Sequence, residues 1–166
     1  MQPEPLPPPS ADLAEAMVGL WRLFSREDHD AGGRRLIDPA LGADPIGVLS
    51  FSPTHFAAQF MRRDRGAAPA AEGARAAGPA SAAAAAAAGT NNSTASDGYD
   101  AYFGRYTVDA AAGLVTVHLE GAITPANIGL ALTRDIRVVG NRLTIRLGTS
   151  TPDAVPITRT LVFERA

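Results

Sequence analysis

His118 and Glu120 have the residue types and the spacing of an acid–base couple. Because they stand two residues apart in a predicted strand, their side chains project from the same face. If that face is inward, the imidazole and the carboxylate can transfer protons inside the fold. If it is outward, Val115, Val117 and Leu119 line the interior and the polar pair is solvated. Both interpretations fit the sequence.

Arg134 is the third candidate for chemistry. It shares the more apolar face of a predicted strand with residues such as Leu132 and Ile136, and this alternation turns it inward. An unpaired buried charge is costly, so an inward Arg134 needs Glu120 or a ligand carboxylate or enolate as its partner. Arg159 has a similar place in the last strand, where we expect its guanidinium to reach water near the strand end.

Five other side chains are candidates for lining a ligand pocket. Tyr102 and Tyr106 alternate on one predicted strand. Either their hydroxyls bind a ligand carbonyl, or their rings fill the core with the hydroxyls at the rim. Gln59 and Met61 share a face of another strand, and Phe163 lies on the apolar face of the last one.

Gly19, Trp21 and Arg165 are candidates for closing a barrel. A Gly-x-Trp at the head of the first strand, with an Arg near the end of the last, is typical of the closed end of small ligand-binding β-barrels. Trp21 lines the ligand cup in one interpretation. In the other, which we favour, the indole closes the floor beneath the guanidinium in a cation–π contact.

Extended segments separated by turns must position these residues. A short helix is predicted from Ser10 or Asp12 through Val18, and residues 28–45 are predicted to form a loop. Gly140-Asn141 predicts a two-residue hairpin turn. The predicted strands are residues 20–27, 47–51, 55–62, 99–108, 114–120, 130–139, 142–147 and 157–165.

These elements predict an all-β fold, an eight-stranded antiparallel up-and-down β-barrel with a short N-terminal helix. Closing the sheet removes its unpaired edges and leaves room for a single ligand. The barrel domain is predicted over residues 11–166, after a disordered Pro-rich leader at residues 1–10. Residues 66–98 form an Ala- and Gly-rich insertion, which is either flexible low-complexity chain or a helical lid over the barrel mouth.

Composition excludes several classes of function. The net charge of −2 gives no electrostatic footprint for nucleic acid. The chain has no Lys for a Schiff base and no Cys for disulfides, thiol catalysis or zinc. With three His and no close ligand pair at helical spacing, we expect neither a metal nor a cofactor.

We also expect a cytoplasmic protein with no membrane partner. No segment has the roughly 20 bulky apolar residues of a membrane span, and the N-terminus lacks the features of a secretory signal. No Gly-x-Ser-x-Gly elbow and no Gly-rich phosphate loop is present. Nothing in the sequence predicts an oligomeric state.

Six motifs follow one another at fixed spacing. They are Gly19-Leu20-Trp21-Arg22-Leu23, Asp44-Pro45-Ile46-Gly47-Val48-Leu49, Ala58-Gln59-Phe60-Met61-Arg62, Ala101-Tyr102-Phe103-Gly104-Arg105-Tyr106-Thr107-Val108-Asp109, Val115-Thr116-Val117-His118-Leu119-Glu120-Gly121 and Leu161-Val162-Phe163-Glu164-Arg165. With these motifs, residues 13–166 outside the insertion resemble the bacterial and fungal lipocalin-like domain family. The resemblance implies a lipocalin-type barrel, in a family whose members often lie among secondary-metabolite genes.

The chain departs from the family pattern at two places. Ser52-Pro53-Thr54-His55 replaces the usual Thr-Pro-Asp-Gly turn. Pro125-Ala126-Asn127-Ile128-Gly129 lacks the aromatic residue of the usual Pro-Asn-Trp-x-Gly segment. If that Trp roofs the pocket in relatives, the pocket here is more open or receives a different ligand.

Three functions are compatible with these observations. We expect the barrel to bind a small hydrophobic metabolite. The first alternative is a cofactor-independent isomerase or cyclase acting on a polyketide- or terpenoid-like intermediate. In it, His118 or Glu120 transfers the proton, and Arg134 or a tyrosine holds the oxyanion. The second alternative is a non-catalytic scaffold whose barrel is filled by its own side chains.

Overall fold

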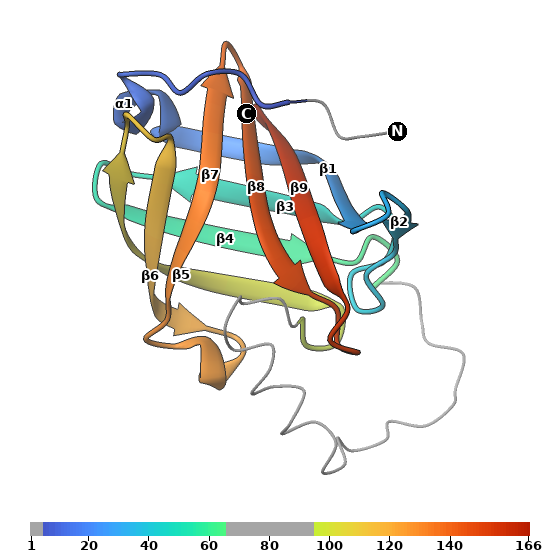
Figure 1. The fold of residues 1–166 in the computed structure, drawn as a ribbon. Helices are drawn as coiled ribbons and strands as arrows, with labels where there is room; N and C mark the ends of the chain where they lie inside the picture. Colours follow the sequence, from blue (N-terminus) through green and yellow to red (C-terminus); the bar gives the residue numbers. More distant parts are fainter. Residues whose placement is uncertain (1–4, 66–94) are drawn as a thin grey trace.

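The computed structural model describes residues 5–65 and 95–166. Within them the chain forms the short helix α1 (Leu13–Met17), the 3-10 helix η1 (Pro125–Asn127) and nine strands (Figure 1). The strands are β1 (Gly19–Asp30), β2 (Arg35–Leu36), β3 (Ile46–Phe51), β4 (His55–Met61), β5 (Tyr99–Asp109), β6 (Leu114–Ala122), β7 (Ala131–Val139), β8 (Arg142–Ser150) and β9 (Pro156–Arg165).

Eight of these strands form a closed antiparallel barrel. Each strand from β3 to β9 pairs with the next, and β1 closes the ring because it pairs with both β3 and β9. Trp21 marks the closure, since its Cα partners are Leu49 in β3 and Arg165 in β9. The two-residue β2 pairs with β1 within the segment predicted to be a loop. The predicted all-β, eight-stranded barrel with a short N-terminal helix is confirmed.

One end of the barrel is closed by Trp21 beneath α1. The indole is fully buried, and its Nε1–H donates to the Met17 carbonyl over 2.7 Å. The Arg165 guanidinium carbon lies 4.2 Å from the indole ring centroid, and the group donates to two carbonyls at the end of α1. A Cβ at Gly19, where φ is +136°, would stand 2.6 Å from Arg165 Nη1. We call Gly19, Trp21 and Arg165 the closing cluster.

β1 contains a bulge halfway along its length. The register of β1 with β9 slips at Phe24, whose side chain is 60% exposed. Trp21 and Leu23 are turned to the core before the bulge, and Arg26 and Asp28 are buried after it. The bulge therefore brings two charged side chains into the barrel interior.

A second irregularity lies in the pairing of β5 with β6. The register shifts after Phe103, so that Gly104 pairs with Leu119 while Phe103 pairs with Gly121, and Glu120 is the extra residue. A Cβ on Gly104 would overlap the His118 carbonyl oxygen. Glycine is required at this position because the neighbouring backbone occupies the space of a side chain.

We expect Gly104→Ala to destabilise the protein by about 1–3 kcal/mol, because the added methyl meets rigid backbone. Urea unfolding measures the difference. Gly148→Ala is the matched control, since a Cβ there has nothing within 4 Å. It should change the free energy of unfolding by less than about 0.5 kcal/mol. Equal midpoints for the two variants would contradict the close approach of β5 and β6.

Two predicted segments are described only in part. In the leader, residues 5–10 form no helix or strand, and the Pro7 carbonyl accepts a hydrogen bond of 2.8 Å from Arg137 Nε. In the insertion, residues 66–94 lie outside the described residues, and so do the two interpretations of it as flexible chain or lid. Its last residues lead into β5 through an isolated bridge between Ser96 and Tyr99.

Candidate functional site

A cavity lies inside the barrel. Its volume is about 60 Å³. Since about 10–15 Å³ is enough to hold one water, the cavity has room for a few waters or a small organic group. Its apolar lining residues are Leu41, Leu49, Phe51, Phe56, Phe60, Val117, Ile136, Ile145, Leu147, Leu161 and Phe163. Its polar lining residues are Arg26, Asp100, Tyr102, Arg134 and Arg159.

Aromatic rings form one side of the cavity. The Tyr102 ring centroid lies 6.0 Å from that of Phe56 and 6.3 Å from that of Phe60. Phe60 in turn lies 6.3 Å from the fully buried Phe163. We call Phe56, Phe60, Tyr102 and Phe163 the aromatic wall. Such a surface is suited to the apolar body of a ligand.

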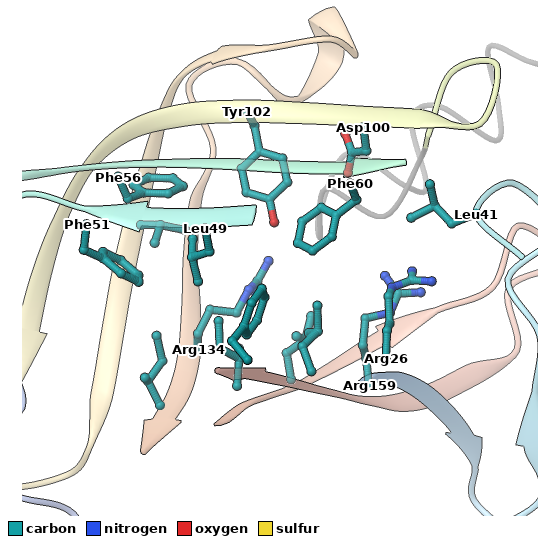
Figure 2. A pocket seen from close by; sticks show the side chains of 16 residues that line it. Arg26, Leu41, Leu49, Phe51, Phe56, Phe60, Asp100, Tyr102, Arg134 and Arg159 are labelled. Atoms are coloured by element: carbon teal, nitrogen blue, oxygen red, sulfur yellow. The ribbon is translucent and has the colours of Figure 1, made fainter. Parts of the chain in front are cut away.

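Tyr102 and Arg134 bring polar groups into this apolar space. In Figure 2 the Tyr102 hydroxyl and the Arg134 guanidinium point toward each other across the cavity. Burial, reinforced by the charge of Asp100, raises the pKa of Tyr102 to about 12, so its hydroxyl is a neutral donor at physiological pH. Burial lowers the pKa of Arg134, but a guanidinium stays charged in proteins. Both groups can donate hydrogen bonds to a ligand oxygen.

Two buried arginine–aspartate pairs lie at another part of the cavity. Arg159 donates to both carboxyl oxygens of Asp28, over 2.7 and 2.8 Å. Arg26 donates to Asp38 over 2.7 Å, and Arg159 lies 3.5 Å from the same Asp38 oxygen. We call these four residues the charged cluster. Figure 2 shows Arg26 and Arg159 side by side near Leu41.

Burial and pairing act in opposite directions on the pKa values of this cluster. Burial is the largest influence on the pKa of Arg26 and lowers it. Burial opposes ionisation of Arg159 too, but the hydrogen bonds and charge of Asp28 raise the pKa of Arg159 overall. Burial would raise the pKa of Asp38, yet its contacts with Arg26 lower it. Pairing within the cluster therefore favours the ionised forms of Asp38 and Arg159.

Asp100 is a buried carboxyl group on the lining of the cavity. It is 5% exposed, and its Oδ1 is buried without a hydrogen-bond partner among the described residues. Burial raises the pKa of Asp100 to about 7, although the charges of Arg26 and Arg159 act against this shift. A carboxyl group of this kind gains or loses a proton near neutral pH.

A comparison with known protein families matches residues 18–165 to the lipocalin-like domain family. The chain belongs to this family. No curated protein matches the chain at a significant level. The family match spans every strand of the lipocalin-like barrel and includes all the residues that line its cavity.

Tyr102, Arg134 and Phe163 are the predicted site residues that line the cavity of this lipocalin-like barrel. The inward position of Arg134 follows from the alternation in β7, where Leu132 and Ile136 are buried on the same face. Glu120, one of the partners expected for Arg134, pairs with Arg105 on the outer face of the barrel instead.

Of the two interpretations of His118 and Glu120, the structure supports the outward one. Both side chains are exposed, while Val115, Val117 and Leu119, on the opposite face of β6, are buried. Glu120 forms a surface ion pair of 2.6 Å with Arg105. The outward interpretation of this pair holds, since apolar alternation decides the face. Neither residue can reach a ligand in the cavity.

Three predicted ligand contacts need correction as well. Gln59 is exposed, and its Oε1 accepts a hydrogen bond of 3.0 Å from the Tyr99 hydroxyl. Met61 shares that outer face, because β4 turns its phenylalanines inward. Tyr106 is buried, but its hydroxyl donates to the Ser52 carbonyl over 2.6 Å, and the residue does not line the cavity. Tyr106 therefore fills the core.

Sequence reasoning did not identify the charged cluster or Asp100. The expectation that Arg159 reaches water is wrong, because Arg159 is 7% exposed and pairs with Asp28. Asp100 could have been found, since it stands two residues before Tyr102 and shares its face of β5. Asp28 could not, because a sequence does not show the bulge that turns it inward.

Over residues 5–65 and 95–166, no three His, Asp or Glu side chains are grouped to hold a metal ion. Over the same residues, no helix combines the length and the apolar character needed to cross a membrane.

Proposed function

We propose that this lipocalin-like barrel binds a small, largely apolar molecule in its cavity. The observation that supports this most directly is the space that the protein's own side chains leave open between opposite walls of the barrel. An apolar cavity with a few polar groups is the usual form of a small-molecule site. The open space also weighs against a scaffold whose barrel is filled by its own side chains.

The lining favours one orientation of the ligand. Its apolar body packs on the aromatic wall, where rings from β4, β5 and β9 meet. A ligand carbonyl or carboxylate accepts hydrogen bonds from Tyr102 and Arg134, two of the donors on the cavity lining. The small volume favours a compact molecule, or a larger one of which only one end enters.

Filling the cavity tests this proposal. Val117 lines the cavity, so Val117→Phe should occupy its space and abolish retention of a small molecule. His118→Phe is the matched control, because it places the same ring on the exposed outer face one residue further. Native mass spectrometry of protein purified from its own host measures the retained molecule in each variant.

We expect the wild type and His118→Phe to carry the same added mass, and Val117→Phe to carry none. Circular dichroism establishes that each variant is folded before its mass is compared. No added mass in any sample, or equal retention in all three, would argue against binding in the cavity.

A further inference from the structure

We propose that the cavity accepts an enolisable ketone and moves a proton between two of its carbon atoms, with Asp100 as the base and Tyr102 and Arg134 as the oxyanion site. This inference rests on the proposed binding function and adds a reaction to it. The reaction class is the shift of a carbon–carbon double bond into conjugation with the ketone.

The position of Asp100 is the first support. The residue lines the cavity from the inward face of β5, and almost none of its surface reaches solvent. The backbone N–H of Ala101 bonds the carboxyl group, while Oδ1 has no partner among the described residues. An unpartnered buried acceptor is unfavourable unless it meets a donor when the cavity is occupied.

The second support is the spacing between the base and the donors. Tyr102 stands two residues from Asp100 on the same face, which separates their Cα atoms by about 7 Å. Its hydroxyl points toward Arg134 in Figure 2. A compact unsaturated ketone can therefore place its oxygen at Tyr102 and Arg134 while its acidic C–H faces Asp100.

The proposed step is balanced without any co-reactant. The Asp100 carboxylate takes a proton from the carbon between the carbonyl and the double bond. The C–H electrons form a new C=C bond, and the carbonyl π electrons move to the oxygen, which Tyr102 and Arg134 hold as a dienolate. The Asp100 acid then returns the proton to the far end of the old double bond, and the carbonyl re-forms.

The charges around Asp100 suit a reversible base. Arg26 on β1, Arg159 on β9 and Asp38 in the β2–β3 loop act on its carboxyl group, and Tyr102 lies beside it on β5. Because burial outweighs the two arginines, the pKa of Asp100 is about 7. Both the base and its conjugate acid are populated near neutral pH, as general acid–base catalysis requires.

The test uses the full chain with 3-cyclohexen-1-one as the probe. Ultraviolet absorbance follows its conversion to the conjugated 2-cyclohexen-1-one. We expect the wild type to exceed the buffer rate, with a rate that rises through about pH 7 as the Asp100 carboxylate forms. Asp100→Asn should lose about 10²–10⁴-fold of the rate enhancement. Asp153→Asn, in the exposed β8–β9 loop, should retain it.

Ligand-observed NMR with cyclohexanone separates binding from reaction, because this ketone has no double bond to move. Cyclohexanone binding to both the wild type and Asp100→Asn, with isomerisation by the wild type alone, supports the proposal. Binding without isomerisation above buffer, or equal rates in both proteins, overturns the reaction and leaves the binding function standing. Absence of cyclohexanone binding overturns the proposed ketone site even if another molecule is retained from the host.

Discussion

Replacing Arg159 by leucine should lower the free energy of unfolding by about 3–5 kcal/mol. The guanidinium makes two hydrogen bonds to Asp28, and both side chains are less than 10% exposed. Removing it leaves a buried carboxylate without its cation, and the carboxylate cannot regain the hydration that it lost on folding. Guanidinium chloride unfolding followed by circular dichroism measures this loss.

Two further variants identify the cause of that loss. The double variant Asp28→Leu/Arg159→Leu removes both charges and keeps the Arg26–Asp38 pair, so it should recover most of the stability. Arg105→Leu breaks the exposed 2.6 Å pair with Glu120 and should cost less than about 1 kcal/mol. A loss in Arg159→Leu no larger than in Arg105→Leu would show that the charged cluster is open to solvent.

Asp100→Asn should make the protein more stable than the wild type at pH 8, by up to about 4 kcal/mol. The pKa of Asp100 is raised from 3.8 to about 7, so the folded protein holds a proton that the unfolded chain has lost between these pH values. Stability from this group is complete below about pH 4 and falls as the pH rises through 7. At about 1.36 kcal/mol per pH unit, the three units amount to the stated difference.

The measurement is the unfolding free energy of wild type and Asp100→Asn at intervals from pH 4 to pH 8. The two proteins should be similar at pH 4 and diverge as the pH rises, because asparagine resembles the neutral acid. Asp153→Asn, which changes an exposed loop residue, should follow the wild type throughout. A constant difference between Asp100→Asn and the wild type would mean that Asp100 has an ordinary pKa.

The fold could be predicted because its determinants are local. Apolar alternation located the eight barrel strands, and some of the turns between them are short and marked by glycine. Gly140, for example, begins the β7–β8 turn with a φ of +58°, which favours glycine. The family motifs placed Trp21 and Arg165 at the first and last strands. These residues meet in the closing cluster because β1 pairs with β9.

The site was harder to predict because it depends on pairing between distant strands. Uninterrupted alternation from Trp21 would turn Ser25 and Glu27 inward, whereas the bulge at Phe24 buries Arg26 and Asp28 instead. A one-residue slip of this kind reverses the face of every later side chain.

Contacts between residues that are far apart in the chain could not be predicted from the sequence either. Arg159 and Asp28 are 131 residues apart in the chain, and nothing near either residue indicates the other. His118 and Glu120 are candidates by residue type, but the apolar alternation of β6 favours the outward face for both. The alternation of apolar residues along a strand therefore predicts which side chains face the cavity better than residue type alone does.

The bulge at Phe24 is a place where β1 can lose a residue without losing its pairing with β9. Phe24 is the residue of β1 that the register with β9 skips, since Leu23 pairs with Phe163 and Ser25 with Val162. Removing Phe24 would let every other residue of the strand keep its partner. A deletion at this point would therefore shorten β1 by one residue, while the closing cluster and the cavity-lining residues of β1 keep their partners in β9.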